Sequence, residues 1–216
     1  MKSKLLAEAI GTAFLLLSIV GSALMAANLF PDQPGLQLLA NAGATGLALY
    51  VLIAIFAPIS GAHFNPVVTA SMVMERDLST KEAVFYVLVQ IVAAILGVMA
   101  AHFIFDSLPI EASGNIRSGV ALWASEIVAT FGLVLLILLA RRQSPGAIPA
   151  LVGCYIAGAY WFTASTSFAN PAVTIGRIIT SSPAGISASD APGFIAMQII
   201  GAALAYGAYK ILADDR

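Results

Sequence analysis

The sequence has few charged residues, one cysteine and two histidines. Only 10% of its 216 residues are charged, and the net charge is -1. Soluble domains are roughly 25% charged, so the composition indicates an integral membrane protein, and the near-zero net charge gives no argument for nucleic acid as a partner. The single Cys154 excludes an internal disulfide, and two histidines without ligand spacing predict neither a metal site nor any other cofactor.

Apolar residues dominate the chain instead. They make up 60% of it, and the mean hydropathy is +0.94. Crossing a hydrocarbon core of about 30 Å takes roughly 20 apolar residues. Six stretches are long enough, and we place them at 5–27, 36–57, 82–105, 118–140, 147–167 and 192–213. Two shorter apolar pieces remain, 65–74 and 170–180, which as helices would reach only about half the bilayer, some 15 Å.

Both short pieces begin with Asn-Pro, in SGAHFNPVVT (60–69) and TSFANPAVTIGR (166–177). Asn is a good helix N-cap and Pro suits the first helical position. Non-helical backbone at membrane depth is tolerated only where it is buried in protein or lines a wet cavity. Each motif therefore predicts a re-entrant loop that starts a half-helix, with Asn65 and Asn170 in near contact at the midplane.

Paired landmarks indicate an internal duplication. Glu8 and Glu126 lie 118 residues apart, Gln90 and Gln198 lie 108 apart, and the two asparagines lie 105 apart. Three spans per copy is an odd number, so the second copy is inverted. The predicted fold class is thus an all-α membrane protein with six transmembrane helices and two re-entrant half-helices in an inverted three-plus-three repeat. We divide the single channel domain, 1–216, into repeat one (1–105), a linker (106–117) and repeat two (118–216).

Lysine and arginine predict the orientation. Those expected on the side of the N-terminus are Lys2, Lys4, Arg76, Lys81, Arg141, Arg142, Lys210 and Arg216. Only Arg117 and Arg177 fall on the other side. By the positive-inside rule both termini are cytoplasmic. We expect Arg177 to snorkel to the interface rather than supply a positive charge to the outer vestibule.

The two asparagines also predict chemistry. Each side-chain oxygen would cap its own helix and leave the amide NH2 free to donate to a passing solute. Each half-helix adds roughly half a positive charge at its N-terminus, so cations should be repelled at the midplane.

These motifs resemble those of the major intrinsic protein family, the aquaporins and aquaglyceroporins, along essentially the whole chain. The matching residues are Ala7-Glu8, Gly11-Thr12, Ser60 to Thr69, Gln90, Ser125-Glu126 and Asn170-Pro171-Ala172. The resemblance implies a pore in each protomer of a homotetramer in the lipid bilayer, passing water and small neutral solutes. The pore midplane would comprise Asn65, Pro66, Val67, Asn170, Pro171 and Ala172. Loop carbonyls, from Gly61, Ala62 and His63 and from Thr166 to Phe168, would form a ladder of acceptors.

The resemblance also implies a four-residue selectivity filter, which falls here on Thr45, Gly158, Ser167 and Val173. None is aromatic or charged, so we expect a wide filter. Val173 stands where the family usually has Arg, which resembles a bacterial branch associated with arsenic resistance. It implies an inner-membrane channel for arsenous acid, methylated arsenicals or glycerol-like polyols, with urea, ammonia and lactic acid left open.

Intramembrane carboxylates are candidate functional groups, so Glu8 and Glu126 have two interpretations. They could relay protons in a coupled secondary transporter, or accept hydrogen bonds from the re-entrant loops; the symmetric pair favours the second. A closed-pore structural protein is a third possibility. The sequence contains neither a pairing of nucleophile and base nor a phosphate-binding loop, so it does not predict an enzyme. Cys154 either faces the pore or is a small buried hydrophobe.

Overall fold

The structure is a computed structural model and describes residues 1–108 and 110–214. Within that part of the chain every regular element is a helix. The long helices are α1 (Lys2–Leu29), α2 (Pro34–Ser60), α4 (Thr80–Ile104), α5 (Val120–Gln143), α6 (Ile148–Phe162) and α8 (Ala191–Asp214). The short ones are α3 (Pro66–Met74), α7 (Pro171–Gly176) and the 3-10 turns η1 (Pro145–Ala147) and η2 (Arg177–Ile179). The predicted all-α membrane fold is confirmed.

Six helices are long and apolar enough to cross a membrane, as predicted. The fifth span differs from its prediction at one end. It was expected to continue to residue 167, but α6 ends at Phe162, and an irregular segment leads from there to Asn170. Apolar composition cannot locate this end, because the segment that follows is buried in protein rather than exposed to lipid.

Close approaches between backbones hold the long helices in two matching groups. α1 packs on α4 and α2, whereas α5 packs on α8 and α6. A Cβ on Gly97 of α4 would lie 2.2 Å from the carbonyl oxygen of Ala13 in α1. A Cβ on Gly201 of α8 would lie 2.6 Å from the carbonyl oxygen of Ile127 in α5. Because lipid offers no hydrophobic force between helices, such small residues permit the tight packing that replaces it.

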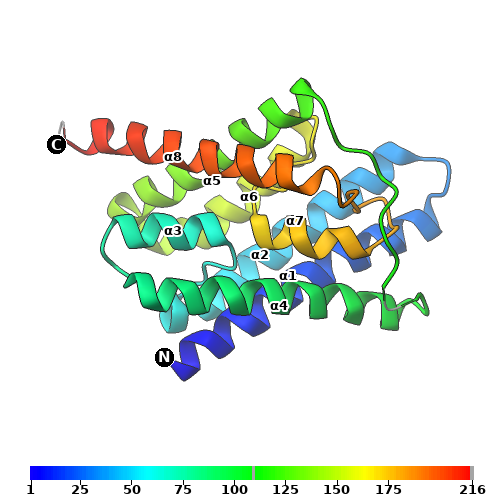
Figure 1. The fold of residues 1–216 in the computed structure, drawn as a ribbon, viewed down its shortest axis with the longest axis horizontal. Helices are drawn as coiled ribbons and strands as arrows, with labels where there is room; N and C mark the ends of the chain where they lie inside the picture. Colours follow the sequence, from blue (N-terminus) through cyan, green and yellow to red (C-terminus); the bar gives the residue numbers. More distant parts are fainter. Residues whose placement is uncertain (109, 215–216) are drawn as a thin grey trace.

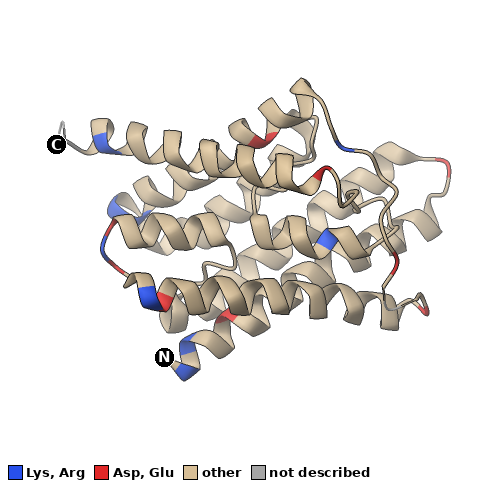
Figure 2. Ribbon diagram, in the orientation of Figure 1, with Lys and Arg blue, Asp and Glu red and all other residues tan. Residues whose placement is uncertain are grey.

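The two short helices lie between these groups, and both contact α4 and α8. Figure 1 shows α3 and α7 starting near the centre of the molecule and running toward opposite ends. The N-terminus and the last turn of α8 lie toward the same end as the outer end of α3. Lysine and arginine gather at this end in Figure 2. Arg216, one of the basic residues counted in the orientation argument, lies outside the described residues.

Candidate functional site

The two asparagines cap the short helices. Oδ1 of Asn65 accepts a hydrogen bond from the backbone N–H of Val67 at 3.0 Å. Oδ1 of Asn170 accepts from the N–H of Ala172 at 2.9 Å and from that of Val173 at 3.3 Å. Both asparagines are in extended conformation, and proline follows each at the first helical position. The Asn-Pro motifs therefore start α3 and α7 in the way their residues predict.

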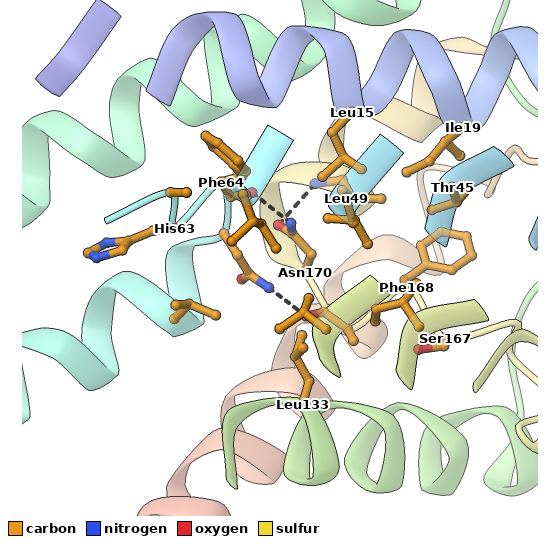
Figure 3. A pocket seen from close by; sticks show the side chains of 18 of the residues that line it. Leu15, Ile19, Thr45, Leu49, His63, Phe64, Leu133, Ser167, Phe168 and Asn170 are labelled. Carbon is orange, nitrogen blue, oxygen red and sulfur yellow. Dashed lines mark hydrogen bonds between the residues drawn. The ribbon is translucent and has the colours of Figure 1, made fainter. Parts of the chain in front are cut away.

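Each asparagine also bonds to the other loop. Nδ2 of Asn65 donates to the carbonyl of Ala169, and Nδ2 of Asn170 donates to the carbonyl of Phe64, both at 2.8 Å. Figure 3 shows these reciprocal bonds as dashed lines. The structure thus brings the two asparagines together, but the amides are not wholly free as expected. One N–H of each amide joins the two loops, and one remains for a solute.

Glu8 anchors the loop before α3. Its Oε1 accepts from the Ser60 hydroxyl at 2.7 Å and from the backbone N–H of His63 at 3.0 Å. Its Oε2 accepts from the N–H of Phe64 at 2.7 Å and from Nε2 of Gln90 at 2.8 Å. The carboxylate is fully buried, and four donors occupy its lone pairs.

Glu126 anchors the loop before α7 in the same way. Its Oε1 accepts from the Ser165 hydroxyl at 2.6 Å and the N–H of Phe168 at 3.0 Å. Its Oε2 accepts from the N–H of Ala169 at 2.9 Å and Nε2 of Gln198 at 2.6 Å. The matching sets of bonds favour the loop-supporting interpretation of both carboxylates over a proton relay.

These bonds hold both loops in an unusual backbone conformation. Ala62 and Phe64 have φ of 49° and 48°, and the corresponding Ser167 and Ala169 have 50° and 48°. A left-handed conformation costs a residue with a side chain roughly 1–2 kcal/mol. Charge-assisted bonds to a buried carboxylate contribute about 1.5–3 kcal/mol each, which is enough to offset that cost.

A cavity adjoins the asparagine pair. Its wall includes Asn65 and Asn170, the loop residues Ala62, His63 and Phe168, and the predicted filter residues Thr45, Ser167 and Val173. In Figure 3, His63 and Phe64 lie on one side of Asn170, and Thr45, Ser167 and Phe168 lie on the other. About 60 Å³ is open to the centres of water molecules, and one water needs about 10–15 Å³ of such space. The cavity therefore has room for a short file of waters.

Several predicted residues stand behind this wall rather than on it. Pro66, Val67, Pro171 and Ala172 form the first turns of the short helices, while Gly61 and Thr166 belong to the loops. None of these six is among the residues that line the cavity. Their contribution is to shape the backbone, with φ of 90° at Gly61 and 62° at Thr166.

The structure does not bring Gly158 to the cavity. Gly158 is exposed on α6, whereas Tyr160 is buried, lines the cavity and has its Oη 3.3 Å from Oγ1 of Thr45. Two residues of α-helix correspond to a rotation of about 200°, so Gly158 and the side chain of Tyr160 lie on nearly opposite sides of α6. Tyr160 therefore places an aromatic ring beside the predicted filter residue Thr45, where we expected no aromatic side chain. Cys154 is also exposed and does not line the cavity, so neither interpretation of it holds.

The prediction that Arg177 snorkels to the interface is wrong. Arg177 is only 1% exposed and lines the cavity on the side of α7. Its Nε donates to the carbonyl of Ala184, and its Cζ lies 3.4 Å from the centroid of the Phe168 ring. Since Val173 is four residues earlier, Arg177 stands about one helical turn further along the same side.

Arg117, from the linker, fastens the segments around the end of α7. Its Nε, Nη1 and Nη2 donate to the carbonyls of Gly185, Ser165 and Pro183 at 2.8, 3.3 and 3.0 Å. Its Cζ lies 5.1 Å from the Phe168 centroid. Burial lowers the pKa of Arg117 and the nearby carboxylate of Glu126 opposes that shift. Sequence reasoning assigned this residue only to a polar linker.

Sequence reasoning also missed four hydroxyl residues that complete the loop supports. Ser60 and Ser165 bond to the carboxylates. Thr69 and Thr174 each bond back to the carbonyl of the capping asparagine and accept from the supporting glutamine. Each pair is separated by the same 105 residues as the asparagines, so the repeat spacing was a signal that could have identified them.

The sequence also matches known proteins. The family described as "Major intrinsic protein" matches residues 1–167. Over 199 residues the chain is 47% identical to "Aquaglyceroporin AqpS" of Rhizobium meliloti (strain 1021), covering 92% of this chain and 85% of that protein. It is 33% identical to human "Aquaporin-5" over 157 residues, which is 67% of this chain but only 56% of that protein.

One solved structure shows a similar fold. The aquaglyceroporin from Plasmodium falciparum superposes with a TM-score of 0.73 and covers 96% of this chain and 95% of that one. The sequences are 20% identical, so this similarity concerns the fold alone.

Proposed function

Because the chain belongs to the major intrinsic protein family, whose members are membrane channels, we propose that it is a passive channel for water and small neutral solutes. The observation that carries the proposal is the reciprocal bonding of Asn65 and Asn170 at the wall of a cavity with room for several waters. Non-helical backbone at this depth is tolerated where it lines such a cavity. The second N–H of each amide, with loop carbonyls from Gly61 to His63 and Thr166 to Phe168, would replace the hydrogen bonds that a solute leaves behind in water.

The solute class we propose is small and hydroxylated. The Ser167 hydroxyl is buried and has no hydrogen-bond partner among the described residues, and the Thr45 hydroxyl lies beside Tyr160. Both line the cavity together with the small Val173, so a solute there meets hydroxyls as well as apolar surface. Glycerol-like polyols, arsenous acid and methylated arsenicals fit this description, and the similarity to a protein named aquaglyceroporin supports such solutes.

We propose the same arrangement in the cell as the sequence predicted. Residues 1–105 and 118–216 would be inverted repeats of one channel domain joined by linker 106–117, as the matching bonds of Glu8 and Glu126 support. The end that carries the termini and most of the basic residues would face the cytoplasm of a bacterium, across its inner membrane. The channel would be a homotetramer in the bilayer.

Solute flux tests the proposal. The purified protein is reconstituted into liposomes, and stopped-flow light scattering records water efflux and then swelling in glycerol, erythritol, urea and arsenous acid. We expect water and glycerol to pass faster than in protein-free liposomes, without saturation and without response to an imposed pH gradient. Flux that saturates and follows the proton gradient would identify a coupled transporter. No flux of any solute would favour a closed-pore protein.

A further inference from the structure

Arg177 is a buried cation on the wall of the cavity. It is 1% exposed, and within residues 1–108 and 110–214 no carboxylate oxygen lies within 4.0 Å of its guanidinium. The carboxylate of Glu126 acts on Arg177 only through its charge and is occupied by four donors of its own. Arg177 therefore faces the cavity without a direct counter-ion from the described part of the chain.

The guanidinium is held in place on one side only. Nε donates to the carbonyl of Ala184, and Cζ lies over the Phe168 ring. In such a cation–π arrangement the guanidinium is attracted to the aromatic face. Nη1 is buried and has no acceptor among the described protein atoms. A buried charged group with an unused donor is costly, so the guanidinium of Arg177, which lines the cavity, is suited to bind an oxygen that enters it.

Arg117 shows what a purely structural arginine looks like in the same region. It also lies over Phe168, but each of its three nitrogens donates to a backbone carbonyl, and it does not line the cavity. Its donors are used within the protein. By contrast, the guanidinium of Arg177 lines the cavity and has a donor that the described part of the protein does not use.

Building on the proposed function, we propose that Arg177 is the fixed cation of the pore and a solute-binding residue. Its guanidinium binds hydroxyl, carbonyl or oxyanion oxygens of the passing solute, and its charge repels cations. Val173 permits this, because its short side chain does not reach across the cavity from one turn earlier. The pore then has two barriers to cations, Arg177 and the N-termini of the half-helices, and not the half-helices alone as Val173 would suggest.

Four proteins in liposomes test the proposal: the parent chain, Arg177→Met, Arg177→Lys and Arg117→Met. The first readout is uptake of radioactive sodium at equal protein incorporation. We expect Arg177→Met to leak at least about tenfold faster than the parent, because a fixed charge changes local ion concentrations by such factors. Arg177→Lys and Arg117→Met should stay as tight as the parent. A tight Arg177→Met, or an Arg177→Lys that leaks equally, would overturn the charge barrier.

The second readout tests binding of an oxygen ligand to the guanidinium of Arg177. Nitrate is a planar oxyanion that matches a guanidinium and does not protonate near neutral pH, so it should slow water flow through the parent and Arg117→Met at least about twofold relative to bulky gluconate. The effect should vanish in Arg177→Met. Equal slowing in that variant, or no slowing in the parent, would refute solute binding at Arg177.

Two further outcomes, a variant that fails to incorporate and a parent that conducts no water, are treated separately. If Arg177→Met fails to incorporate into liposomes, sodium uptake is measured with Arg177→Gln, which keeps N–H donors but removes the charge. A sodium leak is again expected, and a variant as tight as the parent would count against the proposal. A parent protein that conducts no water at all would refute the channel itself, whereas a conducting parent that does not differ from Arg177→Met refutes only the role of Arg177.

Discussion

Replacing Glu126 by glutamine should destabilise the protein through the loop before α7. Oε1 of Glu126 accepts from Ser165 and Phe168, and Oε2 accepts from Ala169 and Gln198. A glutamine keeps one accepting oxygen but presents an NH2 group where the other oxygen was. Two of the four donors then face a donor and lose their acceptor.

The expected cost follows from these two lost bonds. A hydrogen bond to a charged group is worth about 1.5–3 kcal/mol, so the substitution should lower the free energy of unfolding by about 3–6 kcal/mol. For a chain of this size 1 kcal/mol corresponds to roughly 2–4 °C, and the melting temperature should fall by on the order of 10 °C. Glu8→Gln should behave alike, because its four donors are arranged in the same way.

Thermal unfolding of the purified protein in detergent measures this effect, with water flux in liposomes as a second readout. Glu111→Gln, on the exposed linker, is the matched control and should leave both unchanged. The reasoning fails if Glu126→Gln melts at the parent temperature. Should that stable variant also lose a flux dependent on the proton gradient, Glu126 would be a proton relay after all.

Three further predictions concern the cavity, the helix contacts and the end of the molecule that carries the N-terminus. Val173→Arg places a second guanidinium one turn from Arg177 and should reduce glycerol flux relative to water flux by about tenfold or more; equal ratios in swelling assays would contradict the filter role of Val173. Gly97→Leu must separate α4 from Ala13 and should cost at least about 1–3 kcal/mol in thermal unfolding, whereas Gly207→Leu, with open space around its Cα, should not. Burial raises the pKa of Glu75, but hydrogen bonds from Tyr209, Lys210 and Tyr206 outweigh it and hold that pKa below its usual value. Glu75 should therefore stabilise the protein above pH about 4.5, an effect lost as the pH falls through its lowered pKa; Glu75→Gln should flatten this part of a stability curve against pH, and an unchanged curve would refute the linkage.

The sequence was sufficient to predict the fold because its signals are local. Length and hydropathy define the six spans, and Asn-Pro at Asn65 and Asn170 combines a cap with a first-turn proline, which starts a helix wherever it stands. The repeat then follows from spacing alone. The supporting role of Glu8 and Glu126 was accessible for the same reason, since each occurs once per repeat.

The cavity wall was less predictable because it depends on where irregular segments end. The family resemblance placed Gly158 in the filter. However, α6 ends at Phe162, and the rotation of this helix presents Tyr160 to the cavity instead. Arg177 looked like an interfacial residue because it follows an apolar run. The Arg177 side chain points inward because the segment around Ala184 folds back and supplies an acceptor for its Nε. No local sequence pattern indicates that this segment folds back.

The reciprocal bonds of the asparagines also constrain the order in which the protein is assembled. The carbonyl of Ala169 that receives Nδ2 of Asn65 lies more than a hundred residues further along the chain. During synthesis the first loop must therefore wait in the membrane, anchored to Glu8 but without its partner, until the second loop arrives. The four donors gathered on Glu8 all come from residues 60–90, so the bonds that shape the first loop do not depend on any residue of the second loop.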